Sequence, residues 1–427
     1  MSVKGKRLLV LGGGTATLDL VKNAKEMGVY TIVTDYLESG AAKEIADETA
    51  MVSTVDLDAL AELIKERKVD GVFCGPSEFN IRNLIKLCEK TGLPCYTDMT
   101  VWDRCANKDE FKQYCIDNGV DCPRKFEVDE NSTDEELAAV DYPVIVKPVD
   151  GSSSNGISVS HDASTIRECC RFAMEYSKCK RIVVEKYIEN GGELFGARYL
   201  IRDGVATPYL LMDTYIANHK DPKGLISHFT YTPSKYADYY MNNMDANVRR
   251  MLSNMGLKNG TAFFQALPYD GKIYFHEMGY RLSGGMLFKL TTPLMGINDM
   301  KMMIRTALGE KMFEDGELEG INLLNPKKFG AQLTVPLRVG TIGSIEGLED
   351  LKNMPCVVDF IQYYHEGDTL LDKHMGTLGQ HFGRFTMVAD SPEELKSAVA
   401  RINGELIIKD TDGALMNALK FDLERTE

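Results

Sequence analysis

The stretch YPVIVKPVDGSSSNGISVS, residues 142–160, decides how this sequence is read. It begins with the apolar, β-branched run 144–146, which is typical of a buried strand, and Lys147 ends that run. Six small or amide residues, 151–156, follow before the chain returns to a strand at 157–159. The pattern predicts a hairpin whose tip is flexible and rich in exposed backbone amides.

Such a tip suits an anion, because nothing bulky keeps a phosphate away from the backbone N–H groups. Lys147, on the adjacent strand, supplies a compact positive charge for the same anion. The order differs from the Gly-x-x-x-x-Gly-Lys-Ser/Thr loop, in which the lysine follows the glycines and a helix begins. Taken alone, an ordinary flexible turn explains the hairpin equally well.

Further motifs follow the hairpin in a fixed order. The apolar strand 182–184 ends in Glu-Lys-Tyr-Ile at 185–188, and Gln265 precedes HEMGYRLSGG at 276–285. In this order and at these spacings the set resembles the ATP-grasp ligases, a superfamily that includes biotin carboxylase, carbamoyl phosphate synthetase and amino acid ligases. The resemblance covers roughly residues 5–425, and its specific motifs lie between Lys108 and Gly285.

The resemblance implies an ATP site between the hairpin and the strand that ends at 185–188. There, a carboxylate and backbone groups would bind the adenine amine while apolar neighbours enclose the ring. Lys108 stands at a predicted helix start behind Asn107, where a lysine is unfavourable unless an anion is near. The implied ATP contacts are Lys108, Lys147, Gly151, Ser152, Ser153, Ser154, Gly156, Glu185, Lys186, Tyr187, Ile188 and Glu193. Plain surface charges remain the alternative at Lys108 and at the end of the 182–188 strand.

The resemblance also implies a metal site at Gln265 and Glu277. A two-residue turn at Asp270-Gly271 would place these two side chains on opposite faces of the sheet. A three-residue loop beginning at Tyr269 would place them on one face as diagonal neighbours. A shared metal ion therefore predicts the longer loop.

The metal motif departs from its family. The usual pattern is Glu-x-Asn-x-Arg, whereas this chain reads Glu277-Met-Gly279-Tyr-Arg281. Gln265 stands where most members have a carboxylate, although carbamoyl phosphate synthetase also uses glutamine. The resemblance implies Mg²⁺, or Mn²⁺ in its place, on Gln265 and Glu277, with Lys147 and Arg281 as the catalytic residues. One ion or two stays open, and restoring asparagine at 279 is expected to lower the magnesium requirement.

The beginning of the chain predicts a Rossmann-like parallel sheet. An apolar strand at 7–11 leads into Gly12-Gly13-Gly14, and a second strand ends at Asp35, so a dinucleotide site is an alternative. The full Gly-x-Gly-x-x-Gly pattern is missing, which favours a domain that does not hold the nucleotide. The loop Gly75 to Glu78 follows another strand, where open α/β sheets bind ligands, although a plain proline-containing turn is the preferred interpretation.

Length predicts about three domains, and the alternating strands and helices together with the resemblance imply an α/β protein with an ATP-grasp fold. The expected bounds are 1–97 for the Rossmann-like domain, 98–325 for the ATP-grasp domain with its lid hairpin near 125–190, and 326–427 for a small carboxyl-terminal α+β subdomain. The ten cysteines lack metal spacing and are expected to be reduced, as in the cytoplasm. The formal charge of −14 argues against nucleic acid, and no apolar run or signal peptide predicts a membrane partner.

The resemblance therefore implies an ATP-dependent ligase that joins a small carboxylate to an amine or ammonia through an acyl phosphate. ATP and Mg²⁺ would be its cofactors, and a homodimer is left open. The first alternative is an ATP-grasp protein that binds nucleotide but has lost or altered catalysis, because Gly279 removes a metal ligand. The second is an NAD(P)-dependent oxidoreductase that uses residues 12–14 and Asp35.

Overall fold

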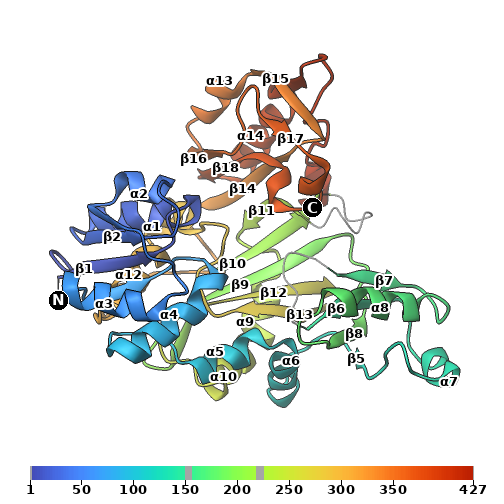
Figure 1. The fold of residues 1–427 in the computed structure, drawn as a ribbon. Coiled ribbons are helices and arrows are strands. Elements are labelled where there is room, and N and C mark those ends of the chain that lie inside the picture. Colours follow the sequence, from blue (N-terminus) through green and yellow to red (C-terminus); the bar gives the residue numbers. More distant parts are fainter. Residues whose placement is uncertain (1, 150–155, 218–225, 427) are drawn as a thin grey trace.

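The computed structural model describes residues 2–149, 156–217 and 226–426. The amino-terminal part is a parallel sheet in the order β3-β2-β1-β4, as the sequence predicts. Its strands are β1 (Arg7–Leu11), β2 (Tyr30–Thr34), β3 (Glu48–Ala50) and β4 (Gly71–Phe73). Its helices are α1 (Thr15–Glu26), α2 (Ala41–Ile45), α3 (Leu57–Arg67) and α4 (Glu78–Thr91). This unit lies at the left of Figure 1.

A long antiparallel sheet forms the centre of the molecule (Figure 1). In spatial order its strands are β13 (Lys272–Gly279), β12 (Gly260–Tyr269), β9 (Glu193–Arg202), β10 (Val205–Ile216), β11 (Ser227–Thr232), β14 (Phe329–Pro336), β18 (His381–Ala389) and β16 (Val357–Gln362). Strand β11 pairs with β14, so the chain beyond residue 325 continues the central sheet. The sequence did not predict this continuity, because strand pairing between distant segments leaves no local pattern.

A smaller sheet carries the predicted hairpin and lies at the right of Figure 1. Its strands, in the order β5-β8-β6-β7, are β5 (Lys125–Phe126), β8 (Ile182–Lys186), β6 (Val144–Pro148) and β7 (Ser158–Ser160). Helices α7 (Asp134–Ala138) and α8 (Ile166–Tyr176) accompany it, and α8 packs on β6. Val146 lies opposite Ser158 on one side and Val184 on the other, which confirms the hairpin.

The remaining elements cover the sheets. Helices α5 (Met99–Ala106) and α6 (Lys108–Asp117) connect the first domain to the small sheet. Around the central sheet lie α9 (Ala237–Asn243), α10 (Asp245–Asn254), α11 (Phe288–Met295) and α12 (Asp299–Ala307). The carboxyl-terminal part adds β15 (Gly340–Glu346), α13 (Leu348–Lys352), β17 (Thr369–Leu370), α14 (Pro392–Glu405) and β19 (Ile407–Asp410).

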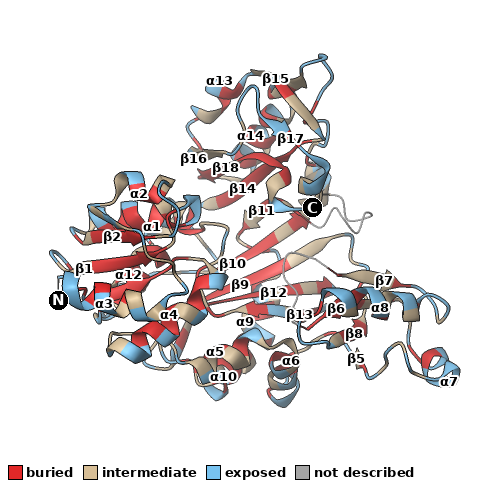
Figure 2. Ribbon diagram, in the orientation of Figure 1, coloured by how far each residue is buried: buried red, intermediate tan, exposed pale blue. Residues whose placement is uncertain are grey.

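Burial follows these layers, and the central strands are buried along most of their length (Figure 2). One apolar cluster joins the first domain to β9, β10, β12 and β13, and a second fills the carboxyl-terminal part. The small sheet has a separate cluster around Val144, Val146, Ile166 and Val184. The hairpin-bearing sheet therefore has its own core, and α6 contacts it through polar groups, such as Lys112 with Glu185.

Candidate active site

The glycine loop of the first domain is closed by its own neighbours. The Gly13 N–H donates to the Asp35 carboxylate at 2.8 Å, and the Leu37 N–H donates to its other oxygen at 3.0 Å. Lys43 packs against the same glycine, since a Cβ there would lie 3.2 Å from the Lys43 Cγ. Asp35 therefore holds the loop through both of its oxygens, which argues against the dinucleotide alternative.

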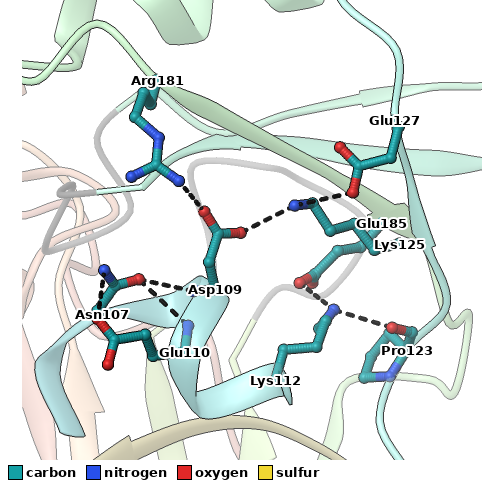
Figure 3. A network of polar contacts seen from close by, with 9 residues as sticks. All are labelled: Asn107, Asp109, Glu110, Lys112, Pro123, Lys125, Glu127, Arg181 and Glu185. Carbon is teal, nitrogen blue, oxygen red and sulfur yellow. Dashed lines mark hydrogen bonds and ion pairs between the residues drawn. The ribbon is translucent and has the colours of Figure 1, made fainter. Parts of the chain in front are cut away.

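A buried ion triplet connects α6, β6 and β8. Lys147 Nζ lies 2.6 Å from one oxygen of Glu185, and Lys112 Nζ pairs with the other oxygen. The side chains of Lys112, Lys147 and Glu185 are only 7%, 10% and 4% exposed. Burial acts to raise the pKa of Glu185, but the two lysines outweigh it, so its pKa lies below the usual value. Figure 3 shows Lys112 reaching both Glu185 and the Pro123 carbonyl.

This use of the Glu185 carboxylate differs from the adenine contact that the sequence predicts for it. Two ammonium groups occupy its oxygens, so the adenine contact would fall to backbone groups of 185–188. Lys186 turns toward Asp141, with Nζ 2.9 Å from the carboxylate, and Ile188 is buried. Lys112 was missed, although its position one helical turn after Lys108 is a usable signal.

Lys108 begins α6 behind the predicted N-cap. The Asn107 side chain accepts from the N–H of Asp109 at 2.9 Å, and Figure 3 shows that Asp109 in turn pairs with Lys125 and Arg181. Lys108 Nζ donates to the Val149 carbonyl at 3.2 Å, beside the hairpin tip.

The charges around Lys108 come from several elements. Burial lowers the pKa of Lys108, and Lys147 adds to this lowering, whereas the carboxylates of Glu277, Glu78 and Glu185 act to raise it. The helix start, the hairpin strand, β13 and α4 therefore bring their charged groups to one place.

Gln265 and Glu277 face each other directly on β12 and β13. The prediction of a three-residue loop is wrong: Tyr269 pairs with Lys272, and the turn is the two-residue Asp270-Gly271 with φ of 47° and 72°. A bulge shifts the register, because Gln265 pairs with Glu277 while Ala266 already pairs with Phe275. The extra residue, His276, brings the two side chains to the same face, and sequence spacing alone could not reveal it.

The oxygen donors of this pair suit one magnesium ion. Mg²⁺ binds through one or two carboxylates plus phosphates and retained waters, and Gln265 adds a neutral oxygen. Among the described residues, no group of three or more His, Cys, Asp or Glu side chains is placed to hold a metal. Gly279 cannot supply a further ligand by substitution, because a Cβ there would overlap the ring of Phe263. The expectation that asparagine can simply be restored at 279 is therefore wrong.

Arg281 joins the central sheet to the first domain. Its guanidinium lies 2.9 Å from the Glu78 carboxylate and 5.2 Å from the centroid of the Phe263 ring. Glu78 is the first residue of α4, so the loop Gly75 to Glu78 reaches this site after all. The sequence placed that loop at a strand's carboxyl end, but the arginine that meets it lies about two hundred residues away and no local pattern connects them.

The other predicted contacts are more scattered. Glu193 begins β9 and pairs with Lys235 at 3.1 Å. Gly156 has φ of 74°, and a Cβ there would lie 2.7 Å from the Tyr176 Cβ, so glycine is needed where the hairpin returns. Gly151, Ser152, Ser153 and Ser154 lie outside the described residues.

Within the described part of the chain, no helix combines the length and the apolar character needed to cross a membrane.

Comparisons with known proteins agree with this architecture. The family described as D-ala D-ala ligase C-terminus matches residues 120–197. A formate-dependent phosphoribosylglycinamide formyltransferase of Sulfolobus acidocaldarius is 25% identical over 315 residues, which cover 71% of this chain and 76% of that protein.

Solved structures extend the similarity over nearly the whole chain. An L-amino acid ligase from Bacillus licheniformis superposes with a TM-score of 0.76 at 22% identity, covering 96% of this chain and 99% of that one. A phosphoribosylglycinamide synthetase from Anaerococcus prevotii gives 0.73 at 21% identity, covering 96% and 100%. The predicted fold is confirmed, because the chain shares the ATP-grasp fold of these ligases over nearly its whole length.

Proposed function

We propose that this protein is an ATP-dependent ligase that forms a carbon–nitrogen bond between a carboxylate and an amine. The observation that supports it best is the convergence of cations and metal-type ligands around Lys108. Lys147 comes from the hairpin strand, and Glu277 with Gln265 comes from the central sheet. Such a site neutralises and positions phosphates, which is most of what phosphoryl transfer requires.

The proposed reaction has two steps, phosphorylation of the carboxylate and attack by the amine. A carboxylate oxygen attacks the γ-phosphorus of ATP, the bond to the β-phosphate oxygen breaks, and ADP leaves. The amine nitrogen then attacks the acyl carbon, the carbon–oxygen bond to phosphate breaks, and the nitrogen loses a proton. No protein nucleophile is needed, because the acyl phosphate is itself the activated species.

Each group of residues has a role in this proposal. Lys108, Lys147 and the hairpin backbone would hold the phosphates, and the backbone of 185–188 would meet the adenine. Glu193 would accept from the ribose hydroxyls. Mg²⁺, or Mn²⁺ in its place, would be held by Glu277 and Gln265 and would neutralise phosphate charge.

Arg281 and Glu78 would form the side of the site that faces the substrates. Arg281 is 17% exposed and carries a charge that suits an acyl phosphate, whereas the Glu78 side chain is 57% exposed. A carboxylate at this position is suited to an ammonium group on the amine substrate. The first domain would therefore take part in substrate binding through α4, and not in binding a nucleotide.

The relatives share one chemical requirement, a carboxylate and a nitrogen nucleophile. One of them is a formate-dependent phosphoribosylglycinamide formyltransferase, and another is an L-amino acid ligase. We infer that small molecules of these classes are the substrates. All ten cysteines are unpaired, which supports the prediction of a cytoplasmic protein, and a homodimer stays a prediction from the sequence.

A screen of carboxylates and amines for ATP-dependent phosphate release tests the proposal. Formate and the amino acids are the first carboxylates, each tried with and without an amine. We expect ADP and phosphate only when both partners are present, and none with Lys147→Ala. ATP binding without phosphate release from any pair would favour the non-catalytic alternative, and NAD binding in the first domain would favour an oxidoreductase.

A further inference from the structure

Arg198 is a buried cation on the same sheet as the proposed metal pair. It lies on β9 and is only 8% exposed. Its Nη1 donates to the carbonyls of Phe264 at 3.0 Å and Ala197 at 3.1 Å, while its Nε has no hydrogen-bond partner among the described residues. Within that same part of the chain, Arg198 forms no ion pair, and Asp299 is the carboxylate that acts on its pKa.

Burial lowers the pKa of Arg198 to about 10, against the raising effect of Tyr209 and Asp299, so the group stays charged at neutral pH. A buried charge without a paired counter-charge is costly, often by several kcal/mol. Asp299 accepts a hydrogen bond from Tyr209 at 2.7 Å and does not pair with Arg198. A buried guanidinium without a paired carboxylate is expected where a bound anion supplies the missing counter-charge.

The strand register places Arg198 on the same face of the sheet as Gln265 and Glu277, one side-chain row away. Gly196 lies opposite Gln265, which lies opposite Glu277, so the three residues form one row across the sheet. Arg198 follows Gly196 by two residues and shares its face. A Cβ at Gly196 would lie 3.5 Å from the Arg198 Nη1, so the guanidinium leans back over this glycine toward the row.

The next row explains why a second metal ligand is missing. Arg198 lies opposite Phe263, which lies opposite Gly279. The Phe263 ring fills the space over Gly279, and the Arg198 guanidinium lies 4.9 Å from the ring centroid on the neighbouring strand. Ring, glycine and arginine therefore form one packed unit in which an additional metal-binding side chain has no room.

We propose that this site holds a single divalent cation and that the Arg198 guanidinium supplies the second positive charge beside the transferring phosphoryl group. The inference rests on the proposed function, because it assigns the γ-phosphate of ATP to the row of Gln265 and Glu277. A guanidinium suits this role, since its planar donors match phosphate oxygens and it keeps its charge when buried. Phe263 holds it in place.

The number of bound metal ions tests the first half of the proposal. Electron paramagnetic resonance counts Mn²⁺ bound per chain in the presence of the non-hydrolysable analogue adenylyl imidodiphosphate. We expect one Mn²⁺ in the parent protein and two in the double variant Phe263→Ala/Gly279→Asn, which opens the space and adds the amide. Two ions in the parent, or one in a folded double variant, would overturn the proposal.

Nucleotide selectivity tests the role of Arg198 without a known substrate. In calorimetry, Arg198→Met should weaken binding of adenylyl imidodiphosphate by roughly ten- to a hundred-fold, the loss of one charged hydrogen bond, and leave ADP binding unchanged. Arg202→Met is the matched control, because it changes the same strand at a residue paired with Asp315 at 2.5 Å, and it should alter neither.

The outcomes separate this inference from the proposed function. Equal weakening of both nucleotides by Arg198→Met would show a purely structural role and overturn the inference. Unchanged affinity for both nucleotides would also overturn it. Failure of the parent protein to bind any adenine nucleotide would instead contradict the proposed function.

Discussion

Replacing Glu185 by glutamine removes the negative charge that lies between Lys112 and Lys147. At about 4 Å and an effective dielectric of about 20, one pair of unit charges is worth about 4 kcal/mol, and breaking a buried pair typically costs about 3–5 kcal/mol. The three side chains are at most 10% exposed, so water cannot replace the carboxylate. We therefore expect Glu185→Gln to reduce the free energy of opening of the small sheet by about 3–5 kcal/mol.

Native-state hydrogen exchange measures this quantity where it acts, in peptides that cover β6 and β8. Asp141→Asn is the matched control, because it breaks the neighbouring ion pair between Asp141 and Lys186. The Asp141 side chain is 62% exposed, so water can replace this contact. That change should cost less than about 1 kcal/mol. If Glu185→Gln opened the small sheet no more easily than the control, the argument that the triplet stabilises the contact between α6 and the hairpin would be refuted.

Three further changes have defined outcomes. Lys147→Ala should weaken ATP binding in calorimetry by about 1.5–3 kcal/mol, with no NAD bound by either protein, and unchanged ATP affinity would contradict the phosphate role. Gly279→Asn alone should lower the thermal unfolding midpoint and add no metal ion, because its Cβ would overlap the Phe263 ring. Burial raises the pKa of Asp213 to about 6. The folded state therefore binds more protons than the unfolded state between about pH 4 and 6, and stability should fall as pH rises through this range, with a shallower slope in urea denaturation of Asp213→Asn.

The parts of the fold that follow local rules could be predicted from the sequence. The hairpin strands around Lys147, the Asn107 cap and the alternating strands and helices of the first domain all have short-range signals. The antiparallel pairing of β11 with β14 has none, so the carboxyl-terminal region looked separate when it continues the central sheet. Pairing of distant strands depends on the whole fold rather than on a window of sequence.

In the candidate site, too, local features could be predicted from the sequence, whereas contacts between distant segments could not. The resemblance implied Gln265 and Glu277 as a metal pair, but the bulge at His276 that brings them opposite each other could not be predicted, and the predicted turn was one residue too long. The partners of Glu185 and Arg281 lie far away in sequence, at Lys112 and Glu78. Gly279 looked like a lost ligand, whereas the structure shows it packed under the Phe263 ring. Side-chain packing of this kind depends on tertiary contacts that a sequence motif does not contain.

Transfer of ¹⁸O from the carboxylate substrate to phosphate tests the central claim most directly. A carboxylate and amine pair found by the phosphate-release screen is used, with both carboxylate oxygens labelled, and the phosphate is analysed by mass spectrometry. An acyl phosphate intermediate requires one labelled oxygen in each phosphate released, together with ADP and the coupled product. Unlabelled phosphate, or AMP with pyrophosphate in place of ADP, would contradict the proposed ligase.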